Sequence, residues 1–242
     1  MSRASQRGCA GGCCSRSRGR PYGGALGARI RFTLRSGAMT HVKICGLTSL
    51  QDARMSVDAG ADAIGLNFWP KSVRRCDEAI ARSIADAVRG QALIVGVFVD
   101  ASRDEILRIR DAVGLECVQL HGDESPELLS EFLPHAYKAL RVRGPEIGQE
   151  VARFAGEHVL LDAYVKGMPG GTGERFDWAL AEGIARTRKL TLAGGLTPDN
   201  VADAVRAVRP YCVDTASGVE SAPGVKDAVL VARFVSNAKA HD

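Results

Sequence analysis

Two side chains in this sequence have the chemistry for proton transfer, and both follow short apolar runs. Cys45 ends the stretch "HVKIC", directly before Gly46, and Asp162 ends "HVLLD". A partly ionised thiol accepts a proton and a carboxyl group donates one, so the pair suits acid–base catalysis. Taken alone, Cys45 is more typical of a packed core residue, because free cysteines are often buried. Asp162 is harder to explain structurally, because an unpaired carboxylate is costly to bury.

Glycine clusters late in the chain indicate a second kind of chemistry, the binding of an anion. They are "PGGTGERF" (169–176), "AGGL" (193–196) and "TASGVE" (215–220). Glycine lets backbone N–H groups approach a ligand closely, and such groups at a helix N-terminus bind phosphate. Each cluster alone could be a tight loop, but the three together favour a phosphate site, with hydroxyl groups of Thr172 and Ser217 as further donors.

Two cations are further candidates. Arg74 belongs to "FWPKSVRR" (68–75), where it either binds a substrate carboxylate or forms part of a solvated basic loop. Lys43 alternates onto the same strand face as Cys45, so it either supports the thiol or has a structural place inside the fold. The sequence by itself leaves both pairs of alternatives open.

Eight apolar runs must position these residues. They are 41–46, 63–68, 93–99, 117–122, 136–142, 158–163, 189–195 and 211–218. Most are nearly continuous rather than alternating, which is typical of strands buried on both faces. Helical patterns lie between them, with predicted starts at Ser49, Asp77, Ser102, Ser125, Pro145, Asp177, Thr197 and after Pro223.

This alternation predicts an α/β protein, a single (β/α)8 TIM barrel over residues 39–242. A doubly wound sheet is the alternative, but its G-x-G-x-x-G turn is missing from "KICGLTSL". Active sites of barrels lie at the carboxyl ends of the strands, and phosphate commonly binds after the seventh and eighth. The remaining strand-end candidates are Asn67, Asp100, Gln119, His121, Arg141, Arg143, Gly194, Gly195, Asp214, Ser217 and Gly218.

Charge and cysteine content set the first 38 residues apart from the rest. Residues 1–38 carry eight arginines and no acid, so the formal charge of +4 for the chain hides a charge of −4 in residues 39–242. A mildly acidic body favours neither nucleic acid nor membrane as a partner, and no apolar run reaches the length of a bilayer span. Four dispersed cysteines in residues 39–242 predict reduced thiols and a cytoplasmic, soluble protein.

The segment 1–38 is predicted to be a disordered Arg/Gly/Ser-rich extension, because it buries too little apolar surface to offset its ordering entropy. A transit peptide and a start codon placed upstream of Met39 are the alternatives. Metal binding by Cys9, Cys13 and Cys14 lacks a fourth ligand nearby. Nucleic-acid binding through the arginines lacks an accompanying aromatic or helical pattern.

A series of motifs in residues 41–237 resembles the phosphoribosylanthranilate isomerase family of tryptophan biosynthesis. They are "VKICGLT", "GADAIGLNFWPKSVR", "VGVFVD", "VQLHGDE", "LLDA", "GGTGERFDW", "AGGLTPDNV" and "VDTASGVE". The resemblance implies an Amadori rearrangement of N-(5′-phosphoribosyl)anthranilate to 1-(2-carboxyphenylamino)-1-deoxyribulose 5-phosphate, without metal or organic cofactor. It also implies a small phosphorylated substrate as partner and either a monomer or a homodimer.

The resemblance further assigns a role to each matching residue. Cys45 is expected to be the general base and Asp162 the general acid, with no covalent intermediate. Arg74 is expected to hold the anthranilate carboxylate, and Asp214 to contact the ribose-derived hydroxyl groups. The expected phosphate-binding residues are Gly171, Gly173, Gly194, Gly195, Ser217 and Gly218. Ala216 stands where the family commonly has serine, which removes at most one hydroxyl contact.

A related sugar-phosphate barrel enzyme is the alternative to this assignment. The histidine-pathway aminoaldose–ketose isomerase would share the phosphate site but is expected to have aspartate in place of Cys45. A ribulose-phosphate epimerase would need a cluster of metal-binding histidines and aspartates, of which only His121 is suitably located.

Overall fold

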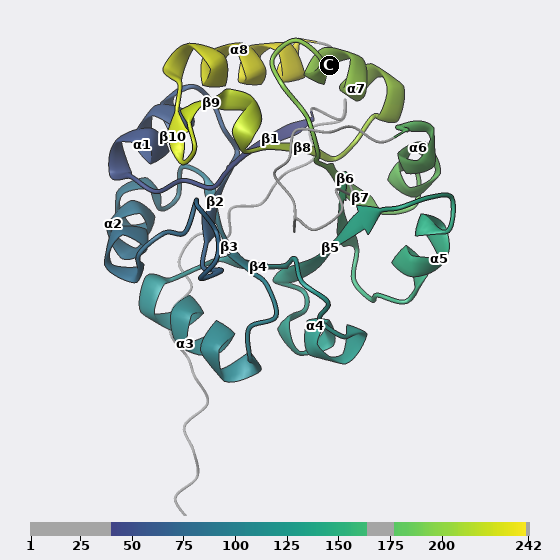
Figure 1. Cartoon of the computed structure of the whole chain (residues 1–242), viewed down its shortest axis with the longest axis horizontal. Coiled ribbons are helices and arrows are strands. Elements are labelled where there is room, and N and C mark those ends of the chain that lie inside the picture. The colour runs from purple at the N-terminus through teal and green to yellow at the C-terminus, as the bar shows by residue number, and fades with distance from the viewer. Residues whose placement is uncertain (1–39, 164–176, 241–242) are drawn as a thin grey trace, which may run out of the picture. The chain divides into compact units, whose positions relative to one another are not determined.

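Eight parallel strands close into a barrel in the order of the chain (Figure 1). The computed structural model describes residues 40–163 and 177–240, so the predicted extension 1–38, Gly171, Thr172 and Gly173 lie outside the described residues. The strands are β1 (His41–Cys45), β2 (Ala63–Asn67), β3 (Leu93–Phe98), β4 (Cys117–Leu120), β5 (Ala136–Val142), β6 (His158–Ala163), β7 (Lys189–Leu192) and β8 (Cys212–Thr215). Because β1 pairs with both β2 and β8, the barrel prediction is confirmed and the doubly wound sheet is excluded.

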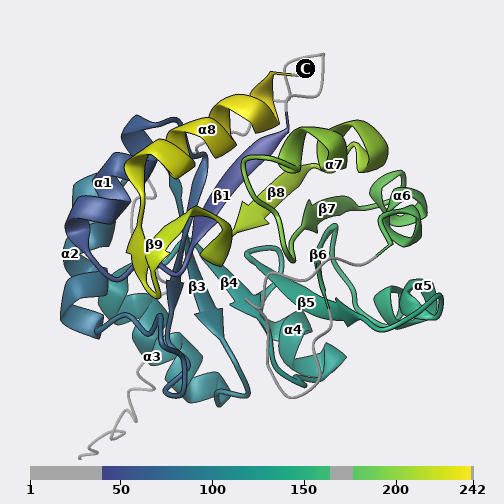
Figure 2. The same cartoon turned by 45° about the horizontal axis from the view of Figure 1, so that its top comes forward.

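Helices surround the strands on the outside of the barrel (Figures 1 and 2). They are α1 (Leu50–Asp58), α2 (Glu78–Val88), α3 (Arg103–Val113), α4 (Pro126–Phe132), α5 (Ile147–Ala152), α6 (Ala179–Ala185), α7 (Val201–Val208) and α8 (Ala228–Lys239). The first four begin as predicted, because a side chain caps each of them. Ser49, Asp77, Ser102 and Ser125 accept hydrogen bonds from backbone N–H groups of the first turn.

The later helices begin a few residues after their predicted starts. Asp177 does accept the N–H of Ala179, but α6 begins only at that alanine. A turn precedes α7, because the amide of Asn200 accepts from Thr197 N–H and donates to the Gly195 carbonyl oxygen. Between Pro223 and α8 lies part of a two-stranded sheet that the sequence did not predict.

That small sheet and the η1 helix replace the end of the predicted eighth strand. Strand β8 stops at Thr215, and the 3-10 helix η1 (Ser217–Val219) follows. β9 (Glu220–Ala222) then pairs antiparallel with β10 (Val225–Lys226), and the two lie beside α1 (Figures 1 and 2). The sequence missed this hairpin because its strands are too short to show a period of two.

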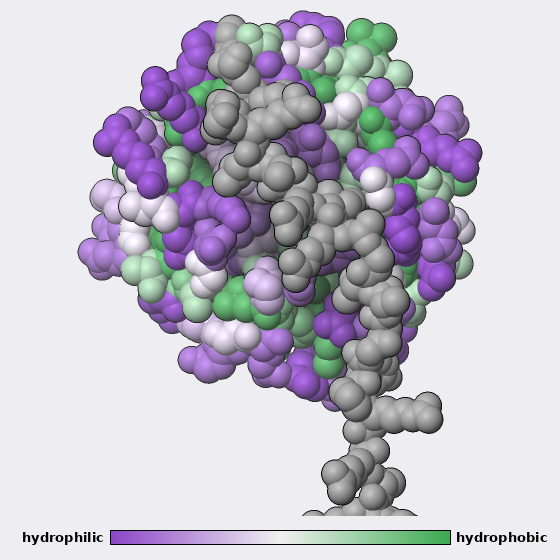
Figure 3. Space-filling view, turned by 180° about the vertical axis from the view of Figure 1, so that it is seen from behind, coloured by the Kyte–Doolittle hydropathy of each residue, from purple (hydrophilic) through white to green (hydrophobic). Residues whose placement is uncertain are grey.

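Alternation along each strand divides the core into two parts. Val42 and Ile44 of β1 belong to the large apolar core between barrel and helices, whereas Lys43 and Cys45 point inward. A small cluster fills the barrel interior, made of Ala63, Val95, Tyr137, Ala139, Leu160 and Ala193. Hydrophilic side chains predominate on the face in Figure 3, with hydrophobic residues scattered among them. In the part of the chain described, no helix is long and apolar enough to cross a membrane.

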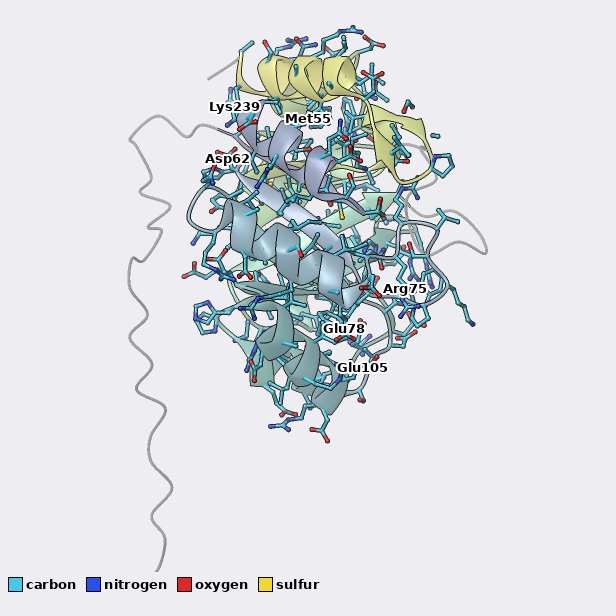
Figure 4. All side chains as sticks on the ribbon, turned by 90° about the vertical axis from the view of Figure 1, so that its left-hand side faces the viewer. Met55, Asp62, Arg75, Glu78, Glu105 and Lys239 are labelled. Carbon is cyan, nitrogen blue, oxygen red and sulfur yellow. The ribbon has the colours of Figure 1, made fainter. Side chains whose placement is uncertain are left out.

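The last helix is fastened to the first strands through Asp62. Its carboxylate accepts the N–H of Val42 at 2.8 Å and forms an ion pair of 2.9 Å with Lys239 of α8 (Figure 4). Burial raises the pKa of Asp62, but the hydrogen bonds that the carboxylate accepts outweigh it and hold the pKa below its ordinary value. Asp62 thereby links the first strand to the last helix, on the side of the barrel opposite the carboxyl ends of the strands.

Candidate active site

A cavity of about 380 Å³ opens at the carboxyl ends of the strands. It brings together every described residue to which the family resemblance assigns a role. These are Cys45, Arg74, Asp162, Gly194, Gly195, Asp214, Ser217 and Gly218, with Asn67, Gln119 and His121 beside them. Of the other strand-end candidates, Arg141 and Arg143 line a separate cavity. Asp100 has a structural role, because its carboxylate accepts the N–H of Asp123 at 2.6 Å.

Cys45 lies on a buried network of charged groups. Lys43 Nζ donates to Asp214 Oδ2 at 2.9 Å, and both side chains are buried inside the barrel. Burial opposes the charge on Lys43, but Asp214 outweighs it and raises the pKa of the ammonium group. Burial raises the pKa of the Cys45 thiol, and Lys43, which also contacts the thiol, counters that rise only in part. Burial therefore disfavours the thiolate before a ligand enters.

Gly65 of β2 makes room for this network, although it was not among the candidates from the sequence. It pairs with Cys45 in the register of the barrel. A Cβ atom at position 65 would lie 2.6 Å from the Sγ of Cys45 and 3.1 Å from the Nζ of Lys43. Glycine is therefore needed there. The available signal was the glycine inside the strand "AIGLN", because interior glycines often mark a close approach.

Asp162 lies at the end of a chain of polar side chains. The hydroxyl of Tyr137 donates to Gln119 Oε1 at 2.9 Å, and Gln119 Nε2 is 3.0 Å from His121 Nδ1. Because an amide nitrogen only donates, Nδ1 accepts and the imidazole proton resides on Nε2. That Nε2 is 3.3 Å from Asp162 Oδ2. The chain thus fixes which imidazole nitrogen faces the carboxyl group.

Arg74 extends from the loop after β2 into the same cavity. Its side chain is 17% exposed, and its Nε and Nη2 donate to the two oxygens of Glu220, each at 2.8 Å. Gly46 gives the side chain its path, because a Cβ there would lie 2.6 Å from Arg74 Cδ. Arg74 is therefore part of the cavity wall and not a solvated loop residue. Neither Glu220 nor its partner Lys226 was among the candidates from the sequence.

The described glycine loops of β7 and β8 lie against each other at the cavity. Gly194 and Gly195 have φ angles of 89° and 65°, in the left-handed region that favours glycine. Thr215 Oγ1 donates to the Leu196 carbonyl oxygen at 2.8 Å and links the two loops. A Cβ at Gly218 would collide with that same carbonyl group, so this close approach requires glycine. Two of the three predicted glycine clusters are thereby placed together.

The fold and this cavity define a (β/α)8-barrel enzyme whose site lies at the carboxyl ends of the strands. The family model described as N-(5'phosphoribosyl)anthranilate (PRA) isomerase matches residues 42–237. The chain therefore belongs to the N-(5′-phosphoribosyl)anthranilate isomerase family, as the resemblance implied.

Individual relatives agree with the family assignment. The chain is 49% identical over 201 residues to N-(5'-phosphoribosyl)anthranilate isomerase of Geobacter sp. (strain M21), covering 83% of this chain and 98% of the relative. It is 52% identical over 195 residues to the N-(5'-phosphoribosyl)anthranilate isomerase of Stutzerimonas stutzeri (strain A1501), covering 80% of this chain and 94% of the relative. The crystal structure of phosphoribosyl anthranilate isomerase from Thermotoga maritima superposes with a TM-score of 0.76 at 41% identity, over 84% of this chain and 100% of that one.

Two further solved structures show relatives with a bound ligand or in a monomeric form. One is the isomerase in complex with reduced 1-(o-carboxyphenylamino)-1-deoxyribulose 5-phosphate, at a TM-score of 0.73 and 40% identity over 84% of this chain and 100% of that one. The other contains monomers generated from the dimeric Thermotoga maritima enzyme. It has a TM-score of 0.74 and 39% identity over 84% of this chain and 100% of that one.

Proposed function

We propose that this chain converts N-(5′-phosphoribosyl)anthranilate to 1-(2-carboxyphenylamino)-1-deoxyribulose 5-phosphate, a step of tryptophan biosynthesis. One observation carries the proposal: a thiol from β1 and a carboxyl group from β6 line one cavity together with Arg74 and the glycine loops of β7 and β8. An aldose-to-ketose conversion needs one group that donates a proton and one that accepts a proton. Membership of the isomerase family supports the same reaction.

The first step is proton donation by Asp162. Its proton goes to the furanose ring oxygen, the bond between that oxygen and C1 breaks, and the nitrogen lone pair forms the C1=N bond of a protonated Schiff base. His121 Nε2 lies 3.3 Å from Asp162 Oδ2. We assign His121 no proton transfer of its own.

The second step is proton removal from C2 by Cys45. The electron pair of the C2–H bond forms the C1=C2 bond of an enolamine, and the C1=N electrons return to nitrogen. The positive charge of the Schiff base lies next to C2, so it favours both the thiolate and the loss of the proton. Burial raises the pKa of the free thiol, so the cationic Schiff base favours its ionisation, and the thiol gives its own proton to solvent before it takes the C2 proton. Tautomerisation of the enolamine then gives the ketone, with no covalent bond to sulfur.

The remaining cavity residues are proposed to bind the substrate. Asp214 Oδ1 is buried without a hydrogen-bond partner, which suits an acceptor for a ribose-derived hydroxyl group. Arg74 would take the anthranilate carboxylate as a charge-assisted pair. The proposed phosphate-binding residues are Gly171, Gly173, Gly194, Gly195, Ser217 and Gly218. The reduced product analogue bound by a relative should therefore bind here.

Two substitutions test the catalytic assignment. Cys45→Ala and Asp162→Asn should each abolish turnover of N-(5′-phosphoribosyl)anthranilate made in situ, because each removes one of the two proton-transferring groups. Both variants should keep the circular dichroism spectrum of the parent protein. Cys76→Ala is the matched control, because Cys76 is a buried thiol that packs in the outer core. Near-parental rates in either catalytic variant would refute the assigned roles.

A cellular setting and an assembly state are also proposed from the same assignment. Cys45, Cys76, Cys117 and Cys212 are all free thiols, which suits a reducing cytoplasm. A monomer or a homodimer is proposed, because a Thermotoga maritima relative is described as dimeric. Sedimentation equilibrium of the purified chain distinguishes the two, and a larger assembly would contradict both.

A further inference from the structure

Arg74 is held from behind by two residues that do not line the cavity. Glu220 accepts from Arg74 Nε and Nη2, and its Oε1 also accepts from Lys226 Nζ at 2.8 Å. The Glu220 and Lys226 side chains are 5% and 0% exposed. We call Arg74, Glu220 and Lys226 the rim triad. A buried carboxylate between two cations restricts the guanidinium to one orientation, because both hydrogen bonds must be satisfied at once.

The hairpin that carries Glu220 and Lys226 is itself anchored to the first helix. The hydroxyl of Thr48 donates to the Gly224 carbonyl oxygen at 2.8 Å. The backbone N–H of Lys226 donates to Asp52 Oδ2 of α1 at 3.2 Å, and its ammonium group also donates to the Ala216 carbonyl oxygen at 2.9 Å. The unpredicted hairpin is thus a fixed platform behind Arg74, and not a loose connection between β8 and α8.

The geometry of the pair leaves one side of the guanidinium for a ligand. Glu220 occupies the edge formed by Nε and Nη2. A guanidinium group has five N–H donors, so the edge formed by Nη1 and Nη2 keeps donors for a second carboxylate. The formal charges of the rim triad sum to +1, because Lys226 neutralises Glu220. Arg74 therefore keeps its net attraction for an anion in spite of its internal salt bridge.

We propose that Glu220, held by Lys226, is a positioning residue that presents the free edge of Arg74 to a substrate carboxylate. It thereby sets the specificity for an aryl amine that carries a carboxyl group. This inference rests on the proposed function, which assigns the substrate carboxylate to Arg74. It adds that the hairpin β9–β10 is the element that makes Arg74 selective.

Charge alone and orientation predict opposite results when Glu220 is changed. Glu220→Gln removes a negative charge behind Arg74, so binding of a carboxylate becomes tighter if charge alone matters. Binding becomes weaker if orientation matters, because the amide nitrogen of glutamine cannot accept a hydrogen bond from Arg74. Glu220→Gln combined with Lys226→Met keeps the triad at +1 and leaves no buried unpaired ammonium group. The double variant therefore separates the effect of orientation from that of charge.

The experiment measures calorimetric Kd values for two ligands. One is the reduced 1-(o-carboxyphenylamino)-1-deoxyribulose 5-phosphate, and the other is its phenylamino counterpart without the carboxyl group. The double variant should bind the first ligand about 10-fold more weakly, because ordering a free arginine side chain then opposes binding. Its affinity for the second ligand should change by less than about twofold. Ser221→Ala, an exposed change on the same strand, is the matched control and should bind both ligands as the parent does.

Three other outcomes would overturn the inference. Equal weakening for both ligands in the double variant would show a general structural role, while the proposed function would stand. Unchanged or tighter binding of the carboxylated ligand would show that charge, and not orientation, is what matters. A parent protein that binds both ligands equally would refute the carboxylate role of Arg74 itself. If the double variant does not fold, Glu220→Gln alone is measured, and weaker binding of the carboxylated ligand is again the expected result.

Discussion

Gly65 offers a test of the site that adds a single methyl group. In Gly65→Ala the new Cβ would lie 2.6 Å from the Sγ of Cys45, 3.1 Å from its Cα and 3.1 Å from the Nζ of Lys43. The Cα belongs to a hydrogen-bonded barrel strand, so the thiol and the ammonium group must move instead. Ordinary contacts of a Cβ begin at 3.4 Å, so the sulfur must shift by about 1 Å to restore one.

The size of the effect on catalysis follows from that displacement. A misplacement of about 1 Å in a catalytic group costs on the order of 100-fold in rate. The methyl group also overpacks the barrel interior, which destabilises the fold by about 1–3 kcal/mol. For a domain of this size each kcal/mol lowers Tm by about 2–4 °C. The variant should therefore remain folded at 25 °C while its kcat/KM falls by about 100-fold.

The assay combines turnover with thermal unfolding. Consumption of N-(5′-phosphoribosyl)anthranilate made in situ gives kcat/KM, and circular dichroism gives Tm. Gly183→Ala in α6 is the matched control, because a Cβ there meets no atom within 4 Å. That variant should keep full activity and gain about 0.4–1 kcal/mol, since alanine favours the helix and restricts the unfolded chain. Full activity in Gly65→Ala would refute both the placement of Cys45 and its role as base.

Two further predictions concern acid stability and the N-terminal segment. Burial lowers the pKa of His158 to about 3, so below the unfolded value of about 6.5 the unfolded chain gains a proton that the folded chain does not. His158 should therefore lower the free energy of unfolding by at most about 2 kcal/mol between pH 6.5 and pH 5. Urea titrations should show a smaller fall in His158→Gln than in the parent protein. Identical falls in the two proteins would contradict this prediction. Removal of residues 1–38 should leave kcat/KM and Tm unchanged, because the described barrel begins its pairing at His41; a large loss of either would show that the segment is needed.

Local sequence patterns were sufficient for the barrel and for most of its rim. Apolar runs and capping residues act through neighbours a few positions apart, so the number and order of the barrel strands and the starts at Ser49, Asp77, Ser102 and Ser125 were predicted correctly. Strand ends in a barrel converge, which brought Cys45, Asp162 and the late glycines into one cavity. The prediction was inaccurate where a turn precedes the helix, as at Thr197 before α7. It failed where an element has only two or three residues, as in β9 and β10.

What only the tertiary structure decided are the contacts between residues far apart in the chain. Arg74 and Glu220 are 146 positions apart, and no periodicity or motif predicts that they form an ion pair. The need for glycine at position 65 depends in the same way on side chains from the neighbouring strand. The sequence by itself determined which chemical groups stand at the strand ends, because strand order and alternation are local properties. Closure of β1 against β8 decided which of them touch, because burial and ion pairing act through space and not along the chain.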